Sequence, residues 1–153
     1  EGFVPAMLFG GKLGGSYRHK LEADFQVDFL TVQGRGGEKP KAIPALNVNA
    51  EPLKFMEYLL ESPAQTVLFD GNGNAVVVTV PAPARYAVHK LIIHSLRAAT
   101  YRTKAAKDLA QAQALIQLLE AVAADELKAA LADARARGPS WRSKVNAGLK
   151  AIG

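Results

Sequence analysis

The sequence predicts an α+β fold, in which a small mixed or antiparallel sheet comes first and a helical bundle follows. Three observations support this class. Strand patterns lie only before residue 81, at 24–32, 65–69 and 75–80. The alanine-rich remainder favours helices. Strands and helices do not alternate as they would in a parallel βαβ array. We therefore expect an α/β region over 1–83 and a helical bundle over 84–153.

The composition limits the class of protein. The 153 residues contain no cysteine, which excludes disulfides and thiolate ligands and fits a reducing cytoplasm. No apolar run approaches the roughly 18 residues that a membrane-spanning helix needs. The net charge of +5 suits phosphate-bearing partners, although it also serves solubility alone. The chain begins with Glu1 rather than Met, which is typical of a processed or truncated piece.

The first half of the chain alternates between extended and turn-forming segments. Residues 1–23 predict a short extended piece and a glycine-rich turn. Residues 24–32 form the clearest strand, with Asp24, Gln26 and Asp28 on one face. A loop over 33–41 precedes a helix expected at about 51–61. Asn49 is its expected cap, and Pro52 lies in its first turn.

Residues 65–69 and 75–80 predict a hairpin, because the intervening Asp-Gly-Asn-Gly-Asn segment is strong turn chemistry. The second strand is apolar at Val76, Val77, Val78 and Val80. Apolar residues on both faces favour a central strand that is covered on both sides.

Four helices are expected after the hairpin, at about 84–98, 103–122, 125–137 and 140–152. In the first of them, an apolar stripe of Val88, Leu91 and Ile92 would face the core. The opposite side of this helix carries the polar or aromatic residues Tyr86, Lys90, His94 and Arg97. Two cations in register suit a phosphate chain, while an ordinary solvated basic face is the alternative.

The second of these helices has polar residues at its amino-terminal end, on or near a side that is apolar further along. They are Lys104, Lys107, Asp108 and Gln111, and they give way to Leu115 and Leu118. Burying such groups is costly unless they are paired or used. The pattern indicates a polar pocket at the mouth of the bundle, or an ordinary pair between Lys104 and Asp108.

Other candidate sites are weaker. Asp24 and Asp28 could together hold Mg²⁺, although two acids on a solvated strand face are commoner than a metal site. The glycine-rich segment at 10–16 does not have the spacing of a phosphate-binding P-loop. The three histidines lack convincing metal-ligand spacing.

Several of these segments together resemble a bacterial family of nucleotidyltransferase-like proteins, in the polymerase-β-type superfamily. The most specific is Pro-Ala-Pro-Ala-Arg-Tyr-Ala-Val-His-Lys-Leu at 81–91. Arg97 and the Lys-Ala-Ala-Lys-Asp-Leu-Ala-Gln-Ala segment at 104–112 follow it. Weaker matches are Tyr17-Arg18, the Val-Asp-Phe-Leu-Thr segment at 27–31, and Pro52-Leu53 ahead of Tyr58. The resemblance covers roughly residues 16–120.

The resemblance implies a palm whose acidic residues bind two Mg²⁺ ions and align a nucleoside triphosphate with an acceptor hydroxyl. It implies that Asp28 is a metal ligand or the base facing the acceptor, and Asp24 is a second candidate ligand. Lys107 and Asp108 would belong to the active site, with Asp108 orienting Lys107. The triphosphate would be bound by basic residues, namely Lys90, Arg97, Lys104 and Lys107.

One departure from the family pattern is serious, because the sequence lacks the Asp-x-Asp pair of the superfamily. We expect that pair upstream of Glu1, in which case this chain alone would be inactive. The first hypothesis is transfer of a nucleoside monophosphate to an unknown acceptor. A second is a degenerate, non-catalytic module that binds a nucleotide, RNA or a protein. A third is a structural domain whose helical tail makes a dimer.

Overall fold

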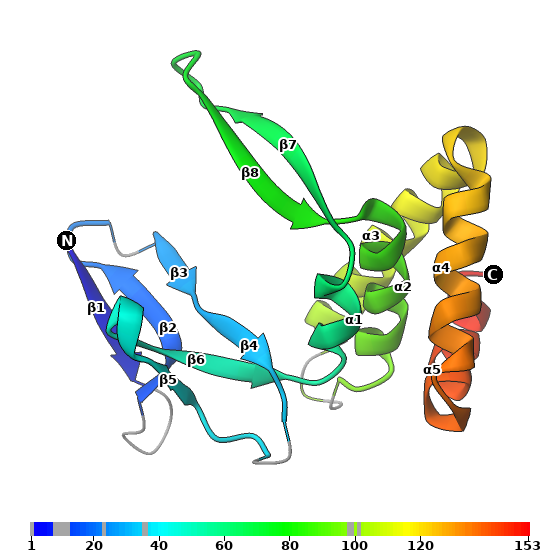
Figure 1. Cartoon of the computed structure of the whole chain (residues 1–153), viewed down its shortest axis with the longest axis horizontal. Helices are drawn as coiled ribbons and strands as arrows, with labels where there is room; N and C mark the ends of the chain where they lie inside the picture. Colours follow the sequence, from blue (N-terminus) through cyan, green and yellow to red (C-terminus); the bar gives the residue numbers. More distant parts are fainter. Residues whose placement is uncertain (1, 8–12, 23, 35–36, 98–99, 101) are drawn as a thin grey trace. The chain divides into compact units, whose positions relative to one another are not determined.

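The computed structural model describes residues 2–7, 13–22, 24–34, 37–97, 100 and 102–153. They form two compact units, Glu1–Glu57 and Tyr58–Gly153. Strands dominate the first unit, while the second joins a hairpin to helices (Figure 1). The predicted α+β class is therefore confirmed. No helix within these described ranges is both long and apolar enough to cross a lipid bilayer.

Two small sheets build the first unit. An antiparallel sheet has the order β1-β2-β3, from the strands Phe3–Met7, Leu13–His19 and Gln26–Asp28. The second sheet has the order β4-β6-β5, from Leu30–Val32, Val48–Leu53 and Lys41–Ile43. In it, β6 runs parallel to β4 and antiparallel to β5, so the sheet is mixed. A 3₁₀ turn, η1 (Pro44–Leu46), joins β5 to β6.

The predicted strand at 24–32 is split at Phe29, where the chain passes from one sheet to the other. The Phe29 N–H donates to the Gly15 carbonyl, and the Phe29 carbonyl accepts from the Glu51 N–H, each at 2.7 Å. A Cβ at position 15 would lie 2.3 Å from the Phe29 oxygen. Glycine is therefore required at position 15. This residue lies within β2 and not in the glycine-rich turn that the sequence predicted.

The helix predicted at 51–61 is wrong for its first part. Residues Val48–Leu53 form β6, and only Met56–Leu60 form a helix, α1. The Asn49 N–H donates to the Tyr17 hydroxyl at 2.9 Å, so this residue is part of a strand and caps no helix. Pairing with strands on both sides stabilises the extended form, and Phe55, in the left-handed region at φ 63°, separates it from α1.

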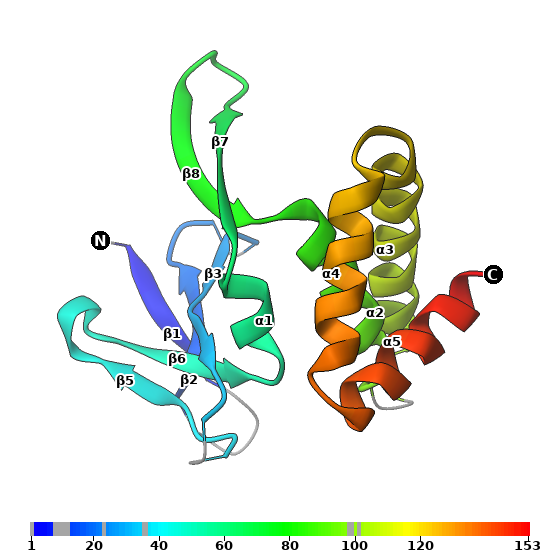
Figure 2. The same cartoon turned by 45° about the vertical axis from the view of Figure 1, so that its right-hand side comes forward.

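The predicted hairpin is confirmed as β7 (Pro63–Phe69) and β8 (Ala75–Pro81). Its turn is fixed by the Asp70 carboxylate, which accepts hydrogen bonds from the backbone of Asn72 and Asn74. The expectation that β8 is a covered central strand is wrong. Among the described strands it pairs with β7 alone. Figures 1 and 2 both show this ribbon projecting from the helices of its unit.

The four predicted helices are present as α2 (Pro83–His94), α3 (Arg102–Val122), α4 (Ala124–Ala136) and α5 (Pro139–Ile152). Helix α2 ends at His94, earlier than expected, and Arg97 lies beyond it. The predicted stripe of Val88, Leu91 and Ile92 is fully buried. Helix α2 packs against the other three, and a Cβ at Gly148 of α5 would lie 2.6 Å from the Leu91 Cβ. Helix α2 is thus the centre of the second unit.

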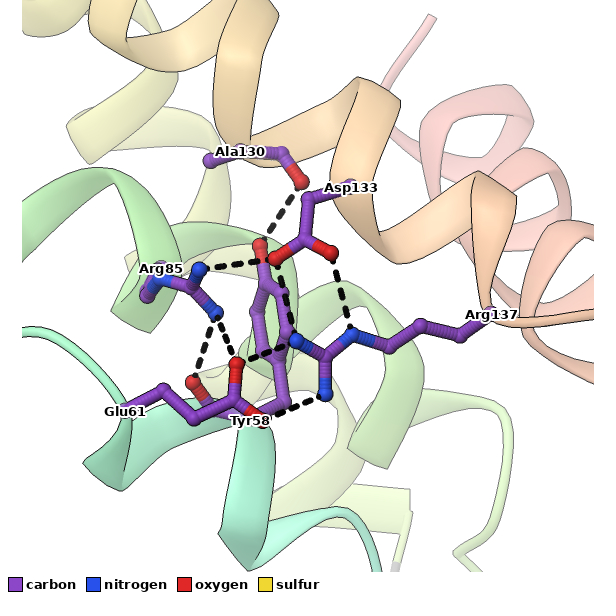
Figure 3. A network of polar contacts seen from close by, with 6 residues as sticks. All are labelled: Tyr58, Glu61, Arg85, Ala130, Asp133 and Arg137. Carbon is purple, nitrogen blue, oxygen red and sulfur yellow. Dashed lines mark hydrogen bonds and ion pairs between the residues drawn. The ribbon is translucent and has the colours of Figure 1, made fainter.

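A network of polar contacts around Tyr58 fixes α1 against α2 and α4 (Figure 3). The buried Tyr58 hydroxyl donates to the Ala130 carbonyl at 2.8 Å. Arg85 donates to the Tyr58 carbonyl at 3.0 Å and to Asp133 at 2.7 Å. Arg137 bonds Asp133 and Glu61 from the other side. Burial raises the pKa of Tyr58 to about 12. The phenol is therefore a neutral structural group at physiological pH.

Candidate functional site

An open pocket of about 330 Å³ lies between α2 and α3. Its lining contains four cations and one carboxylate. The lining residues are Tyr86, Lys90, Arg97, Lys104, Lys107, Asp108 and Gln111. Every basic residue that the sequence singled out for phosphate binding therefore lines this one pocket, although their role stays a prediction.

Asp108 is the centre of the pocket and is only 3% exposed. Its Oδ1 accepts a hydrogen bond from Lys90 Nζ at 2.8 Å. Its Oδ2 accepts a hydrogen bond from Arg97 Nε at 2.9 Å and forms an ion pair with Arg97 Nη2 at 2.8 Å. Each oxygen of the buried carboxylate is thus paired with a cation, and both cations come from α2 and the segment after it.

The charges of this cluster stabilise one another. Burial disfavours the ionised form of Asp108, but the hydrogen bonds and positive charges of Lys90 and Arg97 outweigh it. The pKa of this carboxyl therefore lies below its usual value. Burial also opposes the charge of Lys90, yet its bond to Asp108 and the nearby Tyr86 hold its pKa above the usual value. Asp108 and Lys90 are therefore both charged at neutral pH.

The antiparallel packing of α2 and α3 brings these residues together. One turn of α2 beyond Lys90, His94 Nδ1 donates to the Ala105 carbonyl at 3.1 Å, near the start of α3. The sequence offered a pair between Asp108 and Lys104 on the same helix. It could not predict the contacts with Lys90 and Arg97, because spacing reveals only neighbours on one helix. Lys107 is exposed at the rim and, among the described residues, makes no salt bridge.

Two other pocket residues, Tyr86 and Gln111, were placed by the sequence on the appropriate helix faces but given no role. Lys90 Nζ lies 5.1 Å from the centroid of the Tyr86 ring, so the ring forms a wall beside the lysine. The spacing of these two residues from the lysines could have identified them as pocket residues. Tyr86 precedes Lys90 by four residues, and Gln111 follows Lys107 by four.

The acidic candidates lie in the first unit. Asp28 ends β3 opposite Ser16 of β2. Its Oδ1 accepts hydrogen bonds from Ser16 Oγ at 2.6 Å and from Gln26 Nε2 at 2.7 Å. Asp24 lies in the turn before β3, so the expectation that it shares the strand face with Asp28 is wrong. Of the two acids, only Asp28 is held in a defined position by the recorded contacts.

The described side chains form no cluster of metal-binding groups around Asp28. Within the described ranges, no group of three or more His, Asp or Glu side chains is placed to hold a metal ion. One oxygen of Asp28 already accepts two hydrogen bonds. Since Mg²⁺ often takes only one or two carboxylates together with waters and substrate phosphates, the assignment of Asp28 and Asp24 as metal ligands stays a prediction.

Comparison with known proteins gives one match. The model of a family described as nucleotidyltransferase matches residues 3–136. The matched segment includes β3 with Asp28, and the whole of α2 and α3 with the pocket between them. No curated protein and no solved structure matches the chain.

We expect Asp108→Asn to lower the free energy of unfolding at pH 7 by up to about 3 kcal/mol, because two partly buried cations lose their counter-charge. The contribution of ionised Asp108 is present above its unfolded pKa, near 4, and is lost as the pH falls through the lower folded pKa. The difference between wild type and variant should therefore shrink in urea denaturation between pH 5 and pH 3.

Asp125→Asn is the matched control for this measurement. The Asp125 side chain is 99% exposed and pairs only with a similarly solvated Lys128 among the described residues. It should change stability little at any pH. A difference for Asp108→Asn that stays constant down to pH 3 would contradict the assignment of an ionised, stabilising carboxylate.

Proposed function

This chain belongs to the nucleotidyltransferase family, and from that premise we propose that it binds a nucleoside triphosphate in the pocket between α2 and α3. The proposed reaction transfers the nucleoside monophosphate to an acceptor. Members of the family generally use a nucleoside triphosphate and a divalent metal ion. Triphosphates are cytoplasmic metabolites, and we place the activity in that compartment.

The observation that carries this proposal is the convergence of four cations on one pocket. A triphosphate carries several negative charges, and Lys and Arg side chains provide the donors that its oxygens accept. One carboxylate, Asp108, stands against four positive charges, so the pocket keeps a net charge of about +3. Such a field favours a polyanion over a neutral or singly charged ligand.

Asp108 supports phosphate binding as a positioning residue. An ammonium group has three donors and a guanidinium five, and Asp108 accepts one hydrogen bond from Lys90 and one from Arg97 Nε. The donors that remain can reach a ligand, while the buried carboxylate holds both groups in place. Pre-ordering of this kind reduces the entropy that phosphate binding would otherwise cost.

Asp28 is the acidic residue that we propose for the transfer step. Hydrogen bonds from Ser16 and Gln26 hold it, and it can act as a base toward an acceptor hydroxyl or supply one carboxylate toward a divalent ion. We expect that ion to be Mg²⁺. Waters and substrate phosphates commonly complete the coordination of Mg²⁺, so Asp28 is proposed as one ligand and not as a whole metal centre.

A non-catalytic module that binds a nucleotide, RNA or a protein is the second candidate, since a basic pocket serves binding as well as transfer. The two candidates differ in one observable. Transfer predicts a product in which the acceptor carries a nucleotide, whereas a module predicts binding without any product. Binding of RNA would also weaken steeply as salt rises.

Lys107→Ala is the sharpest test of the pocket, because Lys107 is exposed and its removal leaves the buried pairs intact. We expect the Kd for ATP, measured by calorimetry in 0.15 M salt, to rise about tenfold, since a charged hydrogen bond contributes roughly 1.5–3 kcal/mol. Lys90→Ala should weaken ATP binding further, because it also unbalances Asp108. ATP, GTP, CTP and UTP are all tested, because the preferred base is not assumed.

Lys128→Ala is the control for net charge in that titration. Lys128 lies on α4, outside the pocket, with a side chain that is 76% exposed. It should leave the Kd unchanged within about twofold. If both pocket variants bind every nucleotide as well as this control does, the proposed site is refuted.

Asp28→Asn tests the proposed role in transfer. Asparagine keeps a carbonyl oxygen that can accept from Ser16 and Gln26, so the local fold should survive. In the full-length protein, we expect nucleotide binding in the α2–α3 pocket to be unchanged and nucleotide transfer to fall by about 10²-fold or more. Asp24→Asn is the comparison, with a smaller expected effect. Full activity in the Asp28 variant would make Asp28 an ordinary surface acid.

A further inference from the structure

The pocket between α2 and α3 has two chemically different ends. The contacts of Lys90 with Asp108 and of His94 with Ala105 fix the antiparallel register of the two helices. Tyr86 lies before Lys90 on α2, and Gln111 lies after Asp108 on α3, so both are at one end of the pocket. Arg97 follows α2 and Lys104 lies near the start of α3, so both are toward the opposite end. One end is therefore cationic, and the other is neutral, with an amide and a phenol.

A nucleoside triphosphate has the same polarity along its length. Its phosphate chain is a polyanion that needs donors, while its sugar and base are neutral and carry hydroxyl and amino groups. Cations at the Gln111 end would extend the phosphate site, but the side chains there are uncharged. The change in lining chemistry indicates where the charged part of the ligand ends.

Gln111 also has unused hydrogen-bonding capacity. Its Oε1 is buried, and no described residue donates a hydrogen bond to it. A buried acceptor without a partner costs about 1–3 kcal/mol. Gln111 lines the pocket, and a rotation about its last side-chain bond would bring this oxygen to a donor there. Phosphate oxygens cannot provide that donor at neutral pH, but a hydroxyl group can.

The size of the pocket bears on which neutral group of a nucleotide lies next to the bound phosphates. About 330 Å³ is at the lower end of the range for small-molecule sites, roughly 300–1,000 Å³. Because the pocket is open, a phosphate chain and the group next to it can lie within it while the rest of a nucleotide extends into solvent. The group next to the phosphates is the ribose.

We infer that Gln111 and Tyr86 form the ribose end of the nucleotide site. In this arrangement Gln111 accepts a hydrogen bond from a ribose hydroxyl, and the Tyr86 ring packs against the sugar beside Lys90. The phosphates then extend toward Arg97 and Lys104. This inference rests on the proposed function and assigns Gln111 as a residue that distinguishes ribonucleotides from 2′-deoxyribonucleotides.

The test measures the Kd of three probes, ATP, 2′-deoxyATP and inorganic tripolyphosphate, for wild type and for Gln111→Leu. Leucine has a similar volume and removes the amide. We expect Gln111→Leu to weaken ATP binding about fivefold, to leave tripolyphosphate binding unchanged, and to change 2′-deoxyATP binding less than twofold. Gln113→Leu, at an exposed position of the same helix, is the matched control.

Thermal unfolding checks that Gln111→Leu folds. Because the change removes a buried acceptor without a partner, the melting temperature of the free protein should stay the same or rise. A variant that is more stable and yet binds ATP less tightly separates recognition from folding. If it melts far below wild type, Gln111→Met replaces it, because methionine is an uncharged side chain of similar length that also lacks the amide oxygen.

The outcomes separate this inference from the proposed function. If wild type binds neither ATP nor tripolyphosphate, the proposed function fails and the inference falls with it. If both bind, and Gln111→Leu changes neither, the inference alone is overturned. An equal loss for ATP and tripolyphosphate would place Gln111 at the phosphates. An equal loss for ATP and 2′-deoxyATP would overturn the assignment to the 2′-hydroxyl.

Discussion

The carboxylate of Asp108, buried between α2 and α3, is the constraint on which the rest of the pocket depends. A carboxylate this deeply buried is tolerated only when it is paired. Lys90 and Arg97 provide that pairing from the facing chain segment, and in doing so they become fixed at the mouth of the helical unit. The same interaction thus stabilises a helix interface and arranges cations around an open space.

Helix α2 is held from its other side by a second set of charges. Arg85 donates to Tyr58 and Asp133, and Arg137 donates to Asp133 and Glu61. These hydrogen bonds join α1, α2 and α4. Burial of Leu91 against Gly148 adds close packing with α5. A cation carried by a helix that is fixed on several sides is a more precise ligand than one on a loop.

The helices and the hairpin could be predicted from the sequence because their signals are local. Apolar spacing, alanine content and turn residues define α2 to α5, β7 and β8. The strand β6 was missed, because pairing with β4 and β5 decides its conformation and the sequence pattern does not record pairing. In the same way, spacing identified Lys90, Arg97 and Asp108 as candidates but could not show that the aspartate joins the other two. The capacity of Gln111 is visible only once its surroundings are known.

The central claim is that the α2–α3 pocket holds the phosphates of a nucleotide. A crystal structure of the protein with a non-hydrolysable ATP analogue tests it most directly. The account predicts density for the phosphate chain in contact with Lys90, Lys104 and Lys107, with the Asp108 pairs retained. Ordered phosphates bound elsewhere on the protein, with this pocket holding only solvent at saturating analogue, would contradict it.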